Sequence, residues 1–501
     1  MPPAHRRATA TPRSQSTTRR HHVACRHFID GRVVEGTGAR LPVARPSDLV
    51  EYAEVPIADG DLVDRAVRNA AEAAATSGWA SQPPRERARA MRRWADLIEE
   101  RGTELGRLEA LGSTRPIAQA VSGDVASVAE GIRFFAEWAD KLGGDVAATR
   151  SDNLGLIVSE PYGVVGAITP WNVPLSMASW KAGPALAAGN AIVLKPSELT
   201  PFSTVLLAQL AVKAGIPPGI LNVVHGTGST GEALCRHPGI AKLSFTGSTR
   251  TGIAVMKAAA ESGLKPVTLE LGGKSPQLVF ADADLEKAAA CIAGSLLANA
   301  GQACVAGSRL IVQRAVAEQL ATLLQTLLSD IAPGPTWLET TSFSPIISEQ
   351  QAQSIERIIA ASLEQGAACI FGGGRLEGHR GAFYQPTMLM QVNGETAAVR
   401  KEVFGPVLTI QSFESEEEGF ALADHPEYGL AAGVYTRDLG RALRAMRAIK
   451  AGTVWINRYS RTLDFILPTG GFKSSGIGKD LGRQAVEQNL RHKTVLVDFG
   501  A

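Results

Sequence analysis

Short apolar runs and Ala-rich segments of helical periodicity alternate through the middle of this chain. Residues 163–168 and 191–195 are rich in β-branched side chains, and helical patterns over 175–188 and 200–214 follow them. The alternation continues with strand patterns at 221–224 and 242–245 and helical patterns at 230–235 and from Thr249. Strand, helix and strand in repetition are typical of a parallel sheet covered by helices. Dinucleotide-binding folds are built in this way, so the pattern predicts an α/β cofactor domain.

The regions on either side of this pattern predict further elements. Residues 28–34 are typical of a strand pair with a turn at Asp30-Gly31, and residues 61–111 have helix periodicity. A second α/β unit is expected to begin with a strand at 267–270. Its remaining predicted elements are a buried helix at 284–299, strands at 309–312 and 408–410, and helices at 315–328 and 350–361.

The end of the chain has the pattern of an exposed strand. Residues 494–499 alternate in polarity with almost nothing after them, and residues 154–158 are a similar run that could pair with them. Together they predict a β-arm. Because exposed strand edges seek partners, we expect a homodimer or a homotetramer.

Composition narrows the possibilities. A chain of 501 residues suggests two or three domains, and a net charge of +2 gives no reason to expect a nucleic-acid partner. Polar, Gly or Pro residues interrupt every apolar stretch, so we expect no membrane association. The five widely spaced cysteines favour a reducing cytoplasm and no disulfide framework. Residues 1–26 are Arg-rich and acid-free, which favours a disordered basic tail, with organellar targeting as the alternative.

Three separated segments carry side chains that together suit attack on a carbonyl carbon. Cys304 ends the run GQAC, Glu270 begins the run ELGGKSP, and Asn172 ends the run TPWN. The thiolate is the reactive form of a cysteine, and a thiol of pKa ~8.5 is only a few per cent ionised near neutral pH. No histidine lies near in sequence, so Glu270 is the better candidate base, and a distant histidine is the alternative. Asn172 and the backbone N–H of Cys304 are candidate oxyanion donors.

These three segments, in this order, resemble the non-acylating type of the aldehyde dehydrogenase superfamily. The resemblance extends from about Phe28 to the C-terminus and implies an enzyme that oxidises an aldehyde to its acid. It implies an α/β fold with a Rossmann-type cofactor domain, a second α/β catalytic domain and an oligomerisation arm. The expected boundaries are 27–142 and 162–269 for the cofactor domain, 270–472 for the catalytic domain, and 143–161 and 486–501 for the arm.

A nicotinamide cofactor is required because no side chain can accept a hydride. Residues 226–231 match GxGxxG between a strand and a helix, but no acid follows at the usual distance of ~20 residues. The resemblance instead places the pyrophosphate at the helix that Ser248 opens. Glu198 would accept from a ribose 2′-hydroxyl and repel a 2′-phosphate, so NAD is favoured over NADP. The cofactor-binding residues implied are Ile168, Thr169, Pro170, Trp171, Lys195, Ser197, Glu198, Gly228, Phe245, Thr246, Gly247, Ser248, Gly252, Leu271, Glu402 and Phe404.

Release of the acid requires an activated water, for which Glu270 is again the candidate base. The branch of the superfamily that transfers to coenzyme A usually lacks this glutamate, so its presence favours hydrolysis. Lys181 and Asp480 match a family pair thought to pass protons outward from the glutamate, although Asp480 is one methylene shorter than the commoner Glu. A solvated helix residue is the alternative interpretation of Lys181. No metal site is expected.

The substrate is an aldehyde of undetermined identity. The pocket residues that the resemblance implies are Val173, Met177, Trp180, Ala303, Val305, Leu463, Phe465 and Thr469. Most are apolar, which favours an aromatic or medium-chain aldehyde. Arg458 and Arg461 lie in the same C-terminal loop. We expect both to be solvated, with recognition of a carboxylate as the alternative. The rival functions are a coenzyme A-acylating or semialdehyde-specific enzyme, and a non-catalytic scaffold of the same fold.

Overall fold

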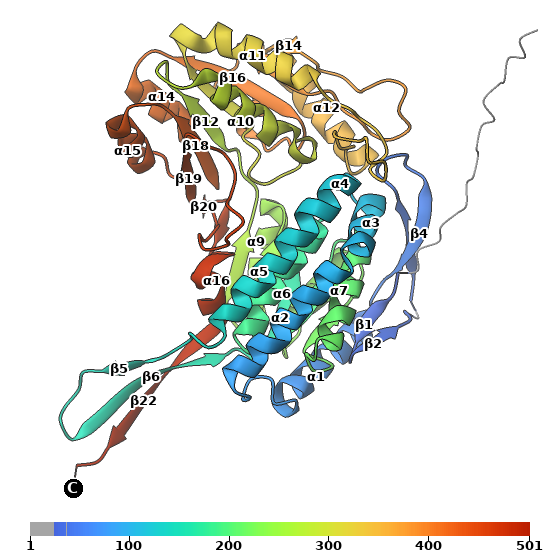
Figure 1. The fold of residues 1–501 in the computed structure, drawn as a ribbon, viewed down its shortest axis with the longest axis vertical. Helices are drawn as coiled ribbons and strands as arrows, with labels where there is room; N and C mark the ends of the chain where they lie inside the picture. The colour runs from blue at the N-terminus through green and yellow to red at the C-terminus, as the bar shows by residue number, and fades with distance from the viewer. Residues whose placement is uncertain (1–24, 37, 501) are drawn as a thin grey trace, which may run out of the picture.

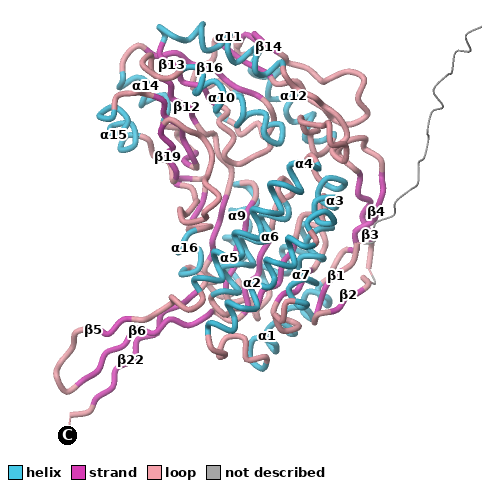
Figure 2. The backbone as a smooth tube through the Cα atoms, viewed as in Figure 1, coloured by secondary structure: helices cyan, strands magenta, loops and turns pink. Residues whose placement is uncertain are grey.

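The computed structural model describes residues 25–36 and 38–500, which form two α/β units and a projecting β-arm (Figures 1 and 2). Within these residues the three largest sheets have eight, seven and three strands. The blue-to-green body in Figure 1 is the first unit, and the yellow-to-brown body above it is the second. Residues 271–275 connect the last parallel strand of the first unit to the first strand of the second.

The first unit is built on a mostly parallel sheet in the order β2-β1-β9-β8-β7-β10-β11-β21. Its strands are β1 (His27–Ile29), β2 (Arg32–Val34), β7 (Val164–Ile168), β8 (Ala191–Lys195), β9 (Leu221–Val223), β10 (Lys242–Thr246), β11 (Val267–Glu270) and β21 (Gly476–Ile477). The five strands from β9 to β11 are parallel, and β8 and β10 are buried along their whole length. Helices on both faces of the sheet explain why these two strands are buried along their whole length. The predicted strands and the parallel sheet are confirmed.

Helices cover both faces of this sheet. They are α1 (Gly60–Thr76), α2 (Pro84–Glu100), α3 (Gly102–Gly112), α4 (Ile117–Gln119), α5 (Ala126–Trp138), α6 (Pro174–Ala187), α7 (Phe202–Lys213), α8 (Gly228–Arg236) and α9 (Thr249–Glu261). Figure 1 shows α2 and α5 side by side over α6. Met91, Trp94 and Ile98 of α2 are fully buried, at the spacing of one helix face. The helical prediction for residues 61–111 is therefore confirmed.

The second unit contains a sheet in the order β14-β15-β16-β13-β12-β18-β19. Its strands are β12 (Pro276–Val279), β13 (Arg309–Gln313), β14 (Ala368–Phe371), β15 (Thr387–Met390), β16 (Val407–Phe413), β18 (Ala431–Tyr435) and β19 (Thr453–Ile456). Its helices are α10 (Leu285–Leu297), α11 (Ala317–Ser329), α12 (Glu349–Glu364), α13 (Ala397–Arg400), α14 (Glu416–Ala423) and α15 (Leu439–Ala448). The predicted helices and strands of this unit are confirmed, with ends shifted by a few residues.

The starting point predicted for the second unit is wrong. Residues 267–270 form β11, which pairs in parallel with β10 of the first sheet, and the second sheet begins only with β12. A strand of four residues such as Val267–Glu270 carries no signal of the sheet it joins, because strand pairing is decided by tertiary contacts. The consequence is functional, since Glu270 ends the last parallel strand of the first sheet and faces the second unit.

The β-arm projects from the lower end of the first unit and contains the C-terminal strand (Figure 1). β22 (Leu490–Asp498) pairs antiparallel with β6 (Asn153–Pro161), and β5 (Asp145–Ala147) adds a third strand. The short helix α16 (Gly482–Glu487) precedes β22. Apolar side chains stand exposed on the arm, among them Val146 and Leu496 with 73% and 62% of their surface accessible. The predicted pairing of the two segments is confirmed, and the oligomer stays a prediction.

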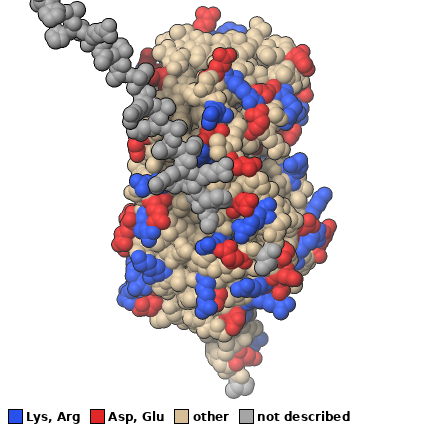
Figure 3. Space-filling model, turned by 90° about the vertical axis from the view of Figure 1, so that its right-hand side faces the viewer, with Lys and Arg blue, Asp and Glu red and all other residues tan. Residues whose placement is uncertain are grey.

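Two small hairpin-like sheets complete the fold, formed by β3 (Arg40–Ala44) with β4 (Glu51–Pro56) and by β17 (Tyr428–Gly429) with β20 (Phe472–Lys473). Most of the predicted basic tail, residues 1–24, lies outside the described residues. Cys25, which that prediction included, is buried in a cluster with Val43 and Tyr52. None of the helices in the described part of the chain has the length and apolar character to span a membrane. On the face drawn in Figure 3, basic and acidic side chains are interspersed.

Candidate active site

Cys304 lies just beyond α10 in a backbone turn that few sequences can adopt. Asn299 and Ala300 have left-handed backbone angles, with φ of 53° and 49°, and Gly301 follows with φ of 70°. A side chain at Gly301 would meet the carbonyl oxygen of Gly405 at 2.3 Å, so only glycine fits there. The turn directs the chain out of the helix and leaves the Cys304 thiol half-buried.

A network of amide hydrogen bonds fixes this turn. The Gln302 side chain donates to the carbonyl oxygens of Asn299 and Pro345, both at 2.9 Å, and accepts from the Ile347 N–H at 2.9 Å. Asn299 Nδ2 in turn donates to the carbonyl oxygen of Asn172 at 2.9 Å. Buried amides that are fully paired hold one conformation, so the nucleophile is carried on a rigid support.

Asn172 is brought to the same place from the first unit. It lies between β7 and α6, and Pro174 begins that helix, which fixes where the preceding residues point. Asn172 Nδ2 donates to the carbonyl oxygen of Gln302 at 3.1 Å, two residues before Cys304. The amide predicted from sequence to serve the thiol is therefore in its immediate surroundings.

Glu270 is buried at the carboxyl end of β11, with 7% of its surface accessible. Its Oε1 has no hydrogen-bond partner among the described residues. Burial and the neighbouring Asp480 raise the pKa of Glu270 well above its ordinary value, and the cations of Lys181, Arg461 and Lys479 oppose them. A raised pKa makes the ionised carboxylate a stronger proton acceptor, as a general base requires.

Lys181 and Asp480 form a buried ion pair beside this carboxyl group. Lys181 Nζ lies 2.6 Å from Asp480 Oδ2, and the two side chains are 0% and 5% exposed. The interpretation of Lys181 as a solvated helix residue is therefore wrong. The shorter Asp480 still reaches the lysine, because its backbone pairs with Thr469 on the adjacent strand-like segment.

The thiol itself is not activated in this arrangement. Burial raises the pKa of Cys304, and the carboxylates of Glu402 and Glu270 raise it further, while Arg461 opposes them. The thiol is therefore mostly protonated near neutral pH, so a base must take its proton when it attacks. Burial also raises the pKa of Cys25 and Cys235, to about 12 and about 11, as expected of structural thiols.

The candidate cofactor residues lie along the carboxyl ends of the parallel strands, where open α/β sheets bind their ligands. Lys195 ends β8, and its Nζ lies 3.3 Å from a carboxylate oxygen of Glu198. Ser248 caps α9 by accepting from the Thr251 N–H, just after the end of β10. The other candidates lie at or just after the ends of these strands or in the first turns of α8 and α9, and they are Ile168, Thr169, Pro170, Trp171, Ser197, Gly228, Phe245, Thr246, Gly247, Gly252 and Leu271.

The second unit contributes Glu402 and Phe404, which contact residues that follow the strands of the first sheet. Glu402 Oε1 accepts from the Gly273 N–H at 3.1 Å, and burial raises the pKa of Glu402 to about 7. The Phe404 ring meets the Trp171 ring edge-on, with centroids 5.2 Å apart, and this contact joins the two units. Hydroxyl-accepting acids, a helix N-terminus and an aromatic face are the groups that a dinucleotide needs, so these residues fit NAD.

The predicted substrate residues lie on the segments that carry the candidate groups. Met177 and Trp180 lie on the same helix as Lys181, Val173 immediately precedes that helix, and Val305 follows Cys304. Phe465 and Thr469 are buried, whereas Leu463 is 68% exposed. That these residues form the substrate pocket stays a prediction.

Arg461 is the functional residue that sequence analysis placed incorrectly. Instead of being solvated like the exposed Arg458, it is half-buried, and Arg461 Nη2 donates to Thr469 Oγ1 at 2.7 Å. Its guanidinium lies 5.3 Å from the centre of the Trp180 ring. No sequence signal marks this position, because both contacts are made by residues whose proximity depends on the folded loop.

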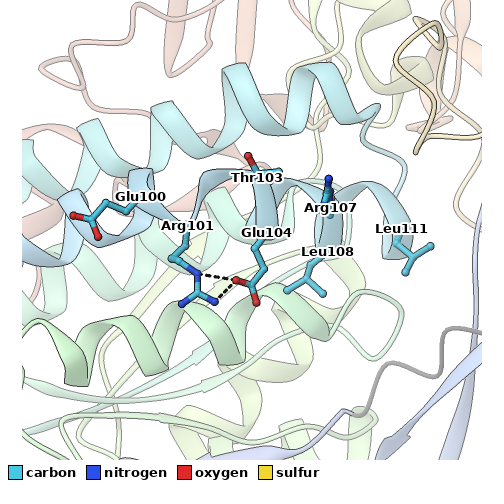
Figure 4. A pocket seen from close by; sticks show the side chains of 7 residues that line it. All are labelled: Glu100, Arg101, Thr103, Glu104, Arg107, Leu108 and Leu111. Atoms are coloured by element: carbon cyan, nitrogen blue, oxygen red, sulfur yellow. Dashed lines mark hydrogen bonds and ion pairs between the residues drawn. The ribbon is translucent and has the colours of Figure 1, made fainter.

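A separate surface hollow of about 440 Å³ lies along α3 (Figure 4). It is lined by residues of α2 and α3, including the exposed ion pair of Arg101 with Glu104. None of the candidate residues borders it. It therefore has no part in the chemistry considered above.

Comparison with known proteins agrees with this geometry. Residues 33–495 match the aldehyde dehydrogenase family. The chain is 41% identical to betaine aldehyde dehydrogenase of Cereibacter sphaeroides over 95% of this chain and 98% of that protein. It is 40% identical to a mitochondrial benzaldehyde dehydrogenase of Antirrhinum majus, over 94% and 88%. The NAD+ complex of an aldehyde dehydrogenase from Bacillus cereus superposes with a TM-score of 0.93 at 38% identity, covering 95% and 97% of the two chains. The chain belongs to the aldehyde dehydrogenase family and is an oxidoreductase that acts on the aldehyde group.

Proposed function

We propose that this enzyme oxidises an aromatic or medium-chain aldehyde to its carboxylic acid through a covalent intermediate on Cys304. The observation that carries this proposal is the convergence of three groups from both units. The Cys304 thiol is half-buried, and the Asn172 amide donates to the carbonyl oxygen of Gln302, two residues before it. The buried Glu270 carboxyl is close enough to raise the pKa of the thiol. That combination serves acyl chemistry on sulfur and has no evident structural purpose.

The first step is attack of Cys304 on the carbonyl carbon, which gives a tetrahedral thiohemiacetal. Glu270 accepts the thiol proton, directly or through water. Asn172 Nδ2 and the Cys304 N–H stabilise the developing oxyanion, and no backbone hydrogen bond among the described residues occupies that N–H. Each such donor contributes about 2.7–4 kcal/mol to lowering the barrier.

NAD is the cofactor, and when bound it supplies the hydride acceptor that the side chains lack. Glu198 and Lys195 hold the adenosine ribose, the α9 N-terminus around Ser248 holds the pyrophosphate, and Glu402 with Phe404 orients the nicotinamide half. Glu198 repels a 2′-phosphate, which favours NAD over NADP. Support comes from the Bacillus cereus structure named above, which is an NAD+ complex.

The second chemical step is hydrolysis of the thioester left on Cys304. Glu270 takes a proton from the attacking water, and its raised pKa makes the ionised carboxylate a stronger base for that transfer. The adjacent Lys181–Asp480 pair accepts and passes on that proton. Because Glu270 is present and poised, water is the acceptor rather than coenzyme A.

The substrate class is proposed from the apolar walls. Met177, Trp180, Val305 and Phe465 form the surroundings of the thiol, together with Val173 and Thr469. Relatives that act on aromatic aldehydes support this choice, since their names specify benzaldehyde and indole-3-acetaldehyde. We further propose a cytoplasmic enzyme that assembles through the β-arm into a dimer or tetramer.

The test is NADH formation with purified enzyme, NAD and a panel of aromatic and aliphatic aldehydes. Cys304→Ala should abolish turnover, whereas Cys369→Ala, which removes the exposed thiol of β14, should retain it. Glu270→Gln should retain NAD binding but lose steady turnover. Failure of the wild-type enzyme to oxidise any aldehyde while it still binds NAD would favour a non-catalytic scaffold. Turnover that depends on added coenzyme A would establish the acylating alternative.

A further inference from the structure

The loop after β19 carries an arginine without an acidic partner. Arg461 makes one side-chain hydrogen bond, to Thr469 Oγ1 at 2.7 Å, and stacks on Trp180. Among the described residues, no Asp or Glu oxygen lies within salt-bridge distance of its guanidinium. A guanidinium has five N–H donors, so most of its hydrogen-bonding capacity is unused by the protein.

The folded loop holds this cation next to the reacting groups. Two residues earlier, the Tyr459 hydroxyl donates to the carbonyl oxygen of Val305 at 2.8 Å, directly after the nucleophile. Gly470, the residue after Thr469, packs against Glu270. A Cβ added at Gly470 would lie 2.7 Å from Glu270 Oε1. Arg461 is therefore tied to both Cys304 and Glu270, and its charge lowers the pKa of each.

A cavity of about 120 Å³ opens beside Arg461. Trp455 and Phe465 supply apolar walls, and Asp464 is its one acidic lining residue. The Asp464 carboxylate already accepts from the Thr462 hydroxyl at 2.9 Å and the Ile466 N–H at 3.3 Å, within its own loop. Two arginines line the cavity, the half-buried Arg461 and the exposed Arg458. An apolar cavity with an excess of positive charge is suited to a ligand that is apolar in its body and anionic at one end.

We propose that Arg461 binds a carboxylate of the substrate, so that the preferred aldehyde is an oxo acid with its two functional groups at opposite ends. This inference rests on the proposed function, because it assigns the substrate class of the same site. The planar guanidinium matches a carboxylate with two parallel hydrogen bonds, and its carbon lies 5.3 Å from the centre of the Trp180 ring. The same charge repels aldehydes that carry an ammonium group.

The experiment compares acids with their methyl esters, which differ in charge at nearly constant shape. The pairs are 4-formylbenzoate with methyl 4-formylbenzoate, and 6-oxohexanoate with its methyl ester. For at least one pair, kcat/KM of the wild type should be about 10- to 100-fold higher for the acid, as expected of a charge-assisted bidentate contact. Arg461→Gln should remove that preference mainly through KM, and Arg461→Lys should restore part of it.

Arg458→Gln is the comparison variant, since it removes the same charge from the second arginine of this cavity, which is exposed to solvent. It should change the acid-to-ester ratio much less than Arg461→Gln. An equal effect of the two variants would assign the preference to the general field of the loop and overturn the inference. A wild type that oxidises esters and acids equally well would also overturn it while leaving the proposed function intact. Oxidation of no aldehyde at all would instead remove the proposed function.

Discussion

The buried pair of Lys181 and Asp480 allows one prediction whose sign is fixed by the structure. Lys181 lowers the pKa of Glu270 and Asp480 raises it. Glu270 acts as a base only when it is ionised, so the rate of deacylation rises with pH through the pKa of Glu270. Lys181→Met should therefore move the rising limb of the pH–rate profile to higher pH. Asp480→Asn should move the same limb to lower pH.

The stability cost of these substitutions is set by burial. The pair is separated by 2.6 Å, and its side chains are 0% and 5% exposed. Removing one partner of such a pair leaves an uncompensated charge and costs about 3–5 kcal/mol. At about 2–4 °C per kcal/mol for a domain of 150–250 residues, each single variant should lower Tm by roughly 6–20 °C. The double variant Lys181→Met/Asp480→Leu removes both charges of the pair and should recover most of that loss.

The assay is single-turnover deacylation measured from pH 6 to pH 9, with Tm recorded at each pH so that only folded enzyme is compared. Opposite displacements of the rising limb would support Glu270 as the titrating base under the control of the pair. Displacement of both variants in the same direction would refute this reasoning, because a general loss of structure would then explain the activity. A double variant with recovered Tm but wild-type deacylation would show that the pair does not carry the proton away from Glu270, while the two single variants still report its effect on the pKa of Glu270.

Three further predictions concern other sites. Burial raises the pKa of Glu109 from 4.5 to about 7, so its contribution to stability is complete below pH 4.5 and lost as pH rises through about 7. Glu109→Gln should equal the wild type near pH 4.5 and exceed it by on the order of 3 kcal/mol at pH 8 in urea unfolding. Glu198→Gln should raise the NADP-to-NAD ratio of kcat/KM roughly tenfold by removing one repulsion, and an unchanged ratio would exclude Glu198 from the ribose site. Gly301→Ala should cost about 2–5 kcal/mol and slow alkylation of Cys304, because it combines a left-handed backbone with a clash at 2.3 Å.

The elements of the fold could be predicted wherever the signal is local. The β-branched run of β8 and the apolar face of α2 each carry their own periodicity, and the structure places both as expected. The sheet to which β11 belongs could not be predicted, since its pairing with β10 depends on contacts outside the run. Local patterns thus determine what an element is, and tertiary packing determines its neighbours.

The site shows the same division between the residues that do chemistry and those that set the charge around them. Cys304, Glu270 and Asn172 were identified because their segments have distinctive sequences, and the fold brings them together. Arg461 has no such segment, and its place is defined by Trp180 and by Thr469, which lie on different parts of the chain. Its charge nevertheless opposes the burial that raises the pKa of both the thiol and the base. A substrate carboxylate that pairs with Arg461 would weaken this opposition while it fixes the aldehyde. Substrate charge and catalytic pKa are therefore coupled through one guanidinium, and the acid and ester substrates should differ in their pH–rate profiles as well as in KM.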